Sequence, residues 1–107
     1  MRSVAAASVL EKADDVILFD TRSPALIERD GLPGAQSLSL EALQAGALPD
    51  LPKDTRIYIV CEHGQISELA ALYLETAGFS DVHNVAGGMR ACRELLAMQT
   101  KGSARTL

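Results

Sequence analysis

The chain has 107 residues, of which 48% are hydrophobic and only 4% aromatic. This composition fits one globular domain with a modest aliphatic core and argues against a disordered chain. The net charge of −4 without a basic cluster argues against nucleic-acid binding. No apolar stretch approaches the roughly 20 residues that a membrane-spanning helix needs.

Localisation and metal binding are also constrained by the sequence. The small apolar residues at the start faintly resemble a secretion signal, but Glu11 and Lys12 follow at once. We therefore expect a cytoplasmic protein that does not act at a membrane. The two cysteines form no Cys/His cluster with zinc spacing, and His63 and His83 are isolated, so we expect no metal site.

The first half of the chain predicts short helices and strands in alternation. We expect a helix over 8–13, a strand over 16–20, a helix from Ser23-Pro24 through 28, a turn over 31–34, a strand over 35–38, a helix over 40–43 and a loop over 46–54. Ser23 caps its helix and Pro24 occupies the first turn, as is typical of helix starts.

The second half continues the alternation. We expect a strand over 57–60, a helix over 67–77 that ends at Gly78, a strand over 82–85, a break at Gly87-Gly88 and a helix over 89–98. The pattern predicts an α/β fold with a mostly parallel sheet of about five short strands and helices on both faces. We expect the domain to cover residues 1–99, with a flexible tail over 100–107.

Cys61 is the leading candidate for chemistry. It follows a buried strand and precedes a helix, so its thiol lies where ligands collect in open α/β sheets. The unpaired N–H groups at a helix start favour a thiolate. Gly64 suits a curled loop that needs a positive φ, and Ser67 either caps the helix or adds a hydrogen bond.

Four short motifs, taken in order, resemble those of the rhodanese domain family. They are Asp20-Thr21-Arg22, Gly31-Leu32-Pro33-Gly34-Ala35, Val60-Cys61-Glu62-His63-Gly64 and Val85-Ala86-Gly87-Gly88. The resemblance covers nearly the whole chain and implies sulfur transfer through a persulfide on Cys61. It implies that the donor is bound by Glu62, His63, Gly64, Gln65, Ile66 and Ser67, and that Asp20 and Arg22 support the active loop.

The resemblance also implies what the reaction uses. The partners are a sulfur donor, either a small molecule or a persulfide-bearing protein, and a thiol or cyanide acceptor. No cofactor is needed, because the reactive atom is the thiol. However, Ile66 stands where the family often has Arg, and Glu62 adds a negative charge, so His63 is the one possible cation of the loop. We therefore predict poor affinity for thiosulfate, a dianion.

Several alternatives stay open at this point. A cysteine phosphatase needs an Arg that Ile66 cannot replace, so we regard that activity as unsupported. A non-catalytic binding module could share the fold. A redox sensor would pair Cys61 with Cys92, although Cys92 lies in a helical pattern that favours core packing. Asp20 and Arg22 could instead act in catalysis, and His63 either faces solvent or serves as a general acid.

Overall fold

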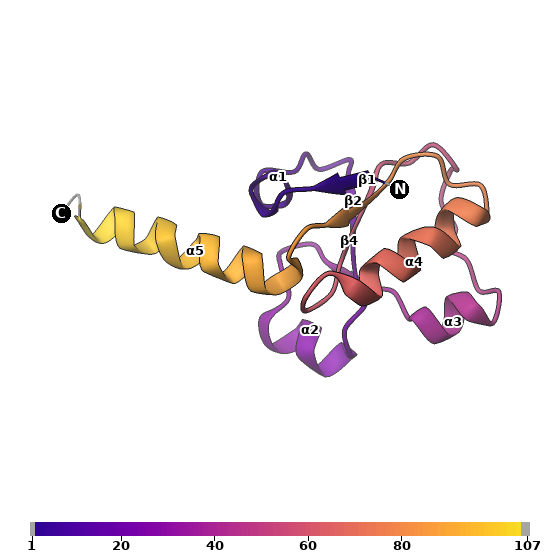
Figure 1. Ribbon diagram of the computed structural model, residues 1–107, viewed down its shortest axis with the longest axis horizontal. Helices are drawn as coiled ribbons and strands as arrows, with labels where there is room; N and C mark the ends of the chain where they lie inside the picture. Colours follow the sequence, from indigo (N-terminus) through magenta and orange to yellow (C-terminus); the bar gives the residue numbers. More distant parts are fainter. Residues whose placement is uncertain (1, 106–107) are drawn as a thin grey trace.

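The computed structural model describes residues 2–105 and the side chains of residues 2–99. Within this part, five strands form one sheet with the order β1-β5-β4-β2-β3, and every neighbouring pair is parallel (Figure 1). The strands are β1 (Arg2–Val4), β2 (Ile17–Asp20), β3 (Gln36–Ser37), β4 (Ile57–Val60) and β5 (Val82–Val85). The helices are α1 (Ala6–Leu10), α2 (Pro24–Asp30), α3 (Leu40–Gln44), α4 (Gln65–Thr76) and α5 (Gly88–Arg105).

The sheet separates two apolar cores. Strand β4 is buried on both sides, and its side chains alternate between the cores as strand geometry requires. Ile57 and Ile59 pack in the core covered by α3 and α4. Tyr58 and Val60 pack in the core covered by α1 and α5. Packing on both sides of β4 therefore fixes the position of Cys61, which directly follows the last residue of the strand.

The predicted elements around Cys61 are confirmed. Strands β4 and β5 have the predicted bounds, and the sheet is parallel. Helix α4 covers Gln65–Thr76 rather than the predicted 67–77, and Gly78 after it adopts a φ of +104°. The N–H of Phe79 donates to the Leu74 carbonyl at 3.1 Å, and the N–H of Gly78 donates to the Glu75 carbonyl at 3.0 Å. These two bonds form the Schellman motif that a glycine after a helix favours.

The two ends of the chain differ from the prediction. Strand β1 was missing from it, because β1 is short, sits at the sheet edge and has two exposed residues, so no apolar pattern signals it. Helix α1 also begins and ends earlier than the predicted span of 8–13. Helix α5 continues to Arg105, past the predicted end at 98, because the end of an apolar repeat does not itself end a helix.

Two predictions made for the whole chain concern its tail and its relation to membranes. Residues 106 and 107 of the predicted flexible tail lie outside the described part, and the tail's flexibility stays a prediction. Among the helices of residues 2–105, none has both the length and the apolar character to cross a membrane.

Candidate active site

Cys61 follows the last residue of β4, and the chain turns there toward α4. Gly64 is the residue before the helix and adopts a left-handed conformation with a φ of +96°, so the predicted positive φ is confirmed. Few residues other than glycine adopt this conformation at low cost. The turn folds the loop back over the thiol, which is only 4% exposed.

The sulfur of Cys61 accepts hydrogen bonds from the loop and the helix start. The Gly64 N–H lies 3.0 Å from Sγ, and the Ser67 hydroxyl oxygen lies 3.3 Å from it. Burial raises the pKa of the thiol, but the Ser67 hydroxyl and the N–H groups of Ser67, Gly64 and His63 lower it, and the pKa falls below its ordinary value. Hydrogen-bond donors from the loop and the start of α4, rather than a neighbouring cation, therefore favour the thiolate.

The first turn of α5 donates hydrogen bonds to the active loop. The Met89 N–H donates to the Cys61 carbonyl at 2.7 Å, and the Arg90 N–H donates to the Glu62 carbonyl at 3.1 Å. A Cβ on Gly88 would lie 2.4 Å from the Cys61 carbonyl oxygen. The absence of a side chain at Gly88 therefore lets this turn pass close to the loop, and the loop carbonyls face α5.

Ser67 and Asn84 form a buried polar contact beneath the loop. Since α4 begins at Gln65, with Gly64 as its capping residue, Ser67 lies inside the helix and the capping interpretation is wrong. Its hydroxyl instead contacts the Cys61 sulfur and the Asn84 side-chain oxygen. The Asn84 amide nitrogen donates to the Gly64 carbonyl at 3.2 Å. Asn84 was not among the predicted site residues, and its one signal in the sequence was an amide within a buried strand.

Asp20 and Arg22 form the ion pair that loop support requires. The Arg22 guanidinium donates two hydrogen bonds to the Asp20 carboxylate, from Nε to Oδ1 at 3.1 Å and from Nη2 to Oδ2 at 3.0 Å. The backbone N–H of Arg22 also donates to Asp20, and Nη1 binds Asp30 at 2.9 Å. Arg22 is 8% exposed and Asp20 is fully buried. The Arg22 guanidinium is therefore already bonded to two carboxylates beside the loop, those of Asp20 and Asp30.

Glu62 is also paired, which corrects the expectation of an acidic loop. Its carboxylate accepts a hydrogen bond from Arg93 of α5 and lies 3.6 Å from Nη1 of Arg22. The Arg93 hydrogen bond holds the pKa of Glu62 below its ordinary value. Arg93 was not among the predicted site residues, and it offsets the Glu62 charge from a different element, helix α5.

The predicted site residues come together around one small cavity. It has a volume of about 140 Å³ and is lined by Thr21, Arg22, Cys61, Glu62, His63, Gln65 and Ile66. His63 and Gln65 are exposed, and Ile66 is 52% exposed at the rim. Gly64 and Ser67 contact the sulfur itself, whereas Asp20 lies behind Arg22. A donor can therefore reach the Cys61 sulfur through a small, mostly apolar cavity, and that sulfur accepts hydrogen bonds from Gly64 and Ser67.

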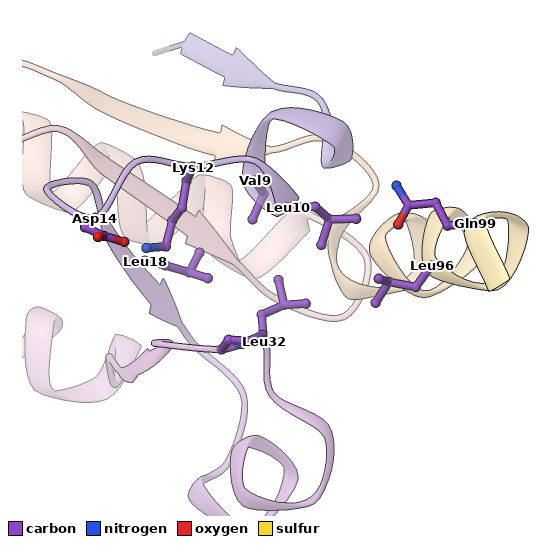
Figure 2. Close-up of a pocket in the computed structure, with 9 residues that line it drawn as sticks. Val9, Leu10, Lys12, Asp14, Leu18, Leu32, Leu96 and Gln99 are labelled. Carbon is purple, nitrogen blue, oxygen red and sulfur yellow. The ribbon is translucent and has the colours of Figure 1, made fainter. Parts of the chain in front are cut away.

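A second cavity lies between α1, β2 and α5, on the face of the sheet that α1 and α5 cover (Figure 2). It has a volume of about 380 Å³, and Leu10, Leu32 and Leu96 converge on it in Figure 2. Its lining includes Lys12, Asp14 and Gln99 but no cysteine, histidine or serine. No group of three or more His, Cys, Asp or Glu side chains that could hold a metal is found in the described part of the chain. The cavity above Cys61 is therefore the candidate active site.

Comparison with protein families gives one match over most of the chain. The family of the rhodanese-like domain matches residues 4–95. Among curated proteins, the thiosulfate sulfurtransferase GlpE of Pseudoalteromonas translucida is 37% identical over 92 residues, which cover 84% of this chain and 87% of that protein.

Solved structures with the same fold are also similar. A rhodanese-related protein from Thermoplasma volcanium aligns with a TM-score of 0.76 and 24% identity, over 88% of this chain and 92% of that one. A Rhodopseudomonas palustris protein of unknown function, described as a possible tyrosine phosphatase, aligns with a TM-score of 0.74 and 29% identity, over 89% of this chain and 81% of that one. The first likeness supports the fold alone.

Proposed function

The chain belongs to the rhodanese-like domain family and is a sulfurtransferase, and we propose that Cys61 is the residue that carries the transferred sulfur. The observation that supports this role is the bonding of its sulfur by the Gly64 N–H and the Ser67 hydroxyl. A thiolate is the nucleophilic form of cysteine, and this arrangement stabilises it. The proposed donor-binding residues are Glu62, His63, Gly64, Gln65, Ile66 and Ser67, with Asp20 and Arg22 in support.

The reaction proceeds in two displacement steps. The Cys61 thiolate attacks the outer sulfur of the donor, a new S–S bond forms, and the donor's own bond to that sulfur breaks. The donor leaves with the electron pair, as a thiolate from a persulfide or as sulfite from thiosulfate. An acceptor thiolate or cyanide then attacks the outer sulfur of the Cys61 persulfide and releases the Cys61 thiolate. Neither step requires a metal, an organic cofactor or an external oxidant.

The donor is a thiol-borne persulfide or another donor of low charge. GlpE relatives are named for thiosulfate, but both guanidiniums near this cavity are already paired, Arg22 with Asp20 and Asp30, and Arg93 with Glu62. Ile66 adds a half-exposed apolar side chain at the rim. A dianion entering this cavity would meet backbone N–H groups and no unpaired guanidinium, which supports weak binding of thiosulfate.

The rival functions lack comparable support. A tyrosine phosphatase holds three phosphate oxygens with a loop that ends in Arg, whereas this loop reaches the helix at Gln65 and has Ile66 there. A sensor that pairs its two cysteines would need Cys92, which is a free thiol buried in the other core. A binding module on this fold would not need a polarised thiol.

The cytoplasm is the location we propose for this chemistry. The thiol must stay reduced between turnovers, and both cysteines are free in the structure. Free thiols persist in reducing compartments.

Mass spectrometry of the intact chain tests the assignment of Cys61. After incubation with a persulfide donor such as glutathione persulfide, we expect a gain of about 32 Da, one sulfur atom, on Cys61. Cys61→Ser should abolish the gain, and Cys92→Ala should retain it. A gain that survives Cys61→Ser, or no gain with any persulfide donor, would exclude the proposed role.

A second experiment tests the donor class. Ile66→Arg adds a guanidinium at the rim of the cavity, where a charge-assisted hydrogen bond to thiosulfate should raise kcat/KM for thiosulfate about tenfold. The activity with glutathione persulfide should change much less. Ile66→Leu serves as the matched control. An unmodified chain that already uses thiosulfate as efficiently as glutathione persulfide would contradict the donor proposal.

A further inference from the structure

The Asn84 side chain can adopt only one amide orientation that satisfies its neighbours. Its nitrogen lies 3.2 Å from the Gly64 carbonyl oxygen, which only accepts hydrogen bonds. The side-chain oxygen must therefore face the Ser67 hydroxyl. Since Asn84 is 7% exposed and Ser67 is fully buried, water does not readily replace either partner.

The Ser67 hydroxyl consequently has two acceptors and a single proton. One acceptor is the Asn84 oxygen, and the other is the Cys61 sulfur at 3.3 Å. When Cys61 is a thiol, its S–H can donate to the Ser67 oxygen while Ser67 donates to Asn84, and every group is paired. When Cys61 is a thiolate, the hydroxyl proton turns to the sulfur and leaves the buried Asn84 oxygen without a donor, which is costly.

We propose that Asn84 is a positioning residue that sets the acidity of Cys61 by competing with its sulfur for the proton of the Ser67 hydroxyl. The amide favours the thiol and partly offsets the N–H groups of the loop, which favour the thiolate. A thiol that is too acidic is a poorer nucleophile, because nucleophilicity falls as the pKa falls. Asn84 thereby keeps Cys61 reactive enough to attack a persulfide. This inference rests on the proposed role of Cys61.

The charged groups around Cys61 come from three elements and stay constant in the test. Arg22 lies after β2, Glu62 and His63 lie in the loop, and Arg93 lies on α5. Within residues 2–99, the Asn84 side chain forms its hydrogen bonds with Ser67 and Gly64 and none with these charged groups. Changes at Asn84 therefore act on Cys61 mainly through Ser67 and Gly64.

The test measures the pH midpoint of Cys61 alkylation by iodoacetamide in the full chain carrying Cys92→Ala. Asn84→Leu removes the competing acceptor and should lower the midpoint by on the order of one pH unit, from the cost of an unpaired buried oxygen. Asn84→Asp keeps an acceptor and adds negative charge, and should raise the midpoint. Asn84→Ala carries the same prediction as Asn84→Leu should the latter fail to fold.

A double-substitution cycle separates this role from a structural one. In a Ser67→Ala background, Asn84→Leu should leave the midpoint unchanged, because the shared proton is gone. Val82→Ala, on the same strand and in the same core, should lower stability without moving the midpoint. An Asn84→Leu midpoint that rises, stays unchanged, or shifts equally without Ser67 would overturn the inference. Alkylation involves no sulfur transfer, so this result is independent of the persulfide test.

Discussion

Cys61 and Cys92 are both buried free thiols, yet their surroundings give them opposite chemistry. Cys61 is 4% exposed and Cys92 is fully buried. Burial raises the pKa of Cys92, and Arg93 offsets this only in part. Burial also raises the pKa of Cys61, but hydrogen bonds from the Ser67 hydroxyl and from the N–H groups of Ser67, Gly64 and His63 reverse the direction. The comparison indicates that hydrogen-bond donors, first the Ser67 hydroxyl and then backbone N–H groups, rather than the degree of burial, set the direction in which each thiol's pKa is shifted.

The difference arises from where each thiol meets the sheet. Cys92 packs with Val60 and Met89 in the core under α1 and α5, where the surrounding groups are apolar. Cys61 comes directly after β4 and meets the start of α4, where N–H groups lack helical partners. A thiol placed at the carboxyl end of a parallel strand therefore gains donors that a core thiol lacks.

Gly88→Ala should have the largest effect on the contrast between Cys61 and Cys92, because it disturbs the loop that supplies the hydrogen-bond donors to Cys61. The added Cβ would lie 2.4 Å from the Cys61 carbonyl oxygen at a φ of +61°, so the turn must move away from the loop. We expect the free energy of unfolding to fall by about 2–4 kcal/mol from steric overlap and backbone strain. Persulfide formation on Cys61 should be lost, as measured by mass spectrometry of the folded fraction.

Gly46→Ala is the matched control for Gly88→Ala. Gly46 also has a positive φ, of +93°, but a Cβ there would meet nothing within 4 Å. It should cost only the backbone strain, about 1–2 kcal/mol, and leave persulfide formation intact. Equal losses of activity in both variants would show that the contact between Gly88 and the active loop is unimportant.

Selective alkylation should show the contrast in the unmodified chain. At neutral pH we expect iodoacetamide to modify Cys61 at least about a hundredfold faster than Cys92, since Cys92 reacts only after local opening. Peptide mapping at timed intervals measures both rates in one sample. Mild denaturant should accelerate Cys92 and slow Cys61, because the donors around the Cys61 sulfur exist only in the folded state. Similar rates in native buffer would contradict the comparison.

The sequence reveals Cys61 and Gly64 but not their full support. A strand, a thiol, a glycine and a helix are consecutive in the chain, so local patterns predict their arrangement. Asn84 lies 17 residues after Ser67, and Arg93 lies 31 residues after Glu62. Only the parallel pairing of β4 with β5, and the return of α5 to the loop, bring these residues to the site.

The missed partners also explain why the charge expected from Glu62 is offset in the folded chain. From sequence alone, Glu62 adds an uncompensated charge beside the nucleophile. In the folded chain Arg93 and Arg22 face that carboxylate, so the loop is close to neutral rather than acidic. The weakness with thiosulfate stays a prediction, and its basis is now that the arginines near the cavity are paired with carboxylates.

The smallest expected difference between Cys61 and Cys92 is in how each thiol makes the free energy of unfolding depend on pH. The folded pKa of Cys61 lies below its value in the unfolded chain, about 8.5. Its contribution to the free energy of unfolding is therefore present above that value and is lost as the pH falls through the folded pKa. The folded pKa of Cys92 is raised, so its contribution is present below about 8.5 and is lost as the pH rises.

Removing each thiol should consequently change the alkaline stability in opposite senses. Between pH 7 and about pH 10, the range around the ordinary thiol pKa, the stability of Cys92→Ala relative to the unmodified chain should rise with pH. The relative stability of Cys61→Ser should fall with pH over the same range, because the favoured thiolate is absent. Urea unfolding followed by circular dichroism measures both differences. Slopes of the same sign would show that the loop donors do not lower the pKa of Cys61 enough to separate it from an ordinary core cysteine.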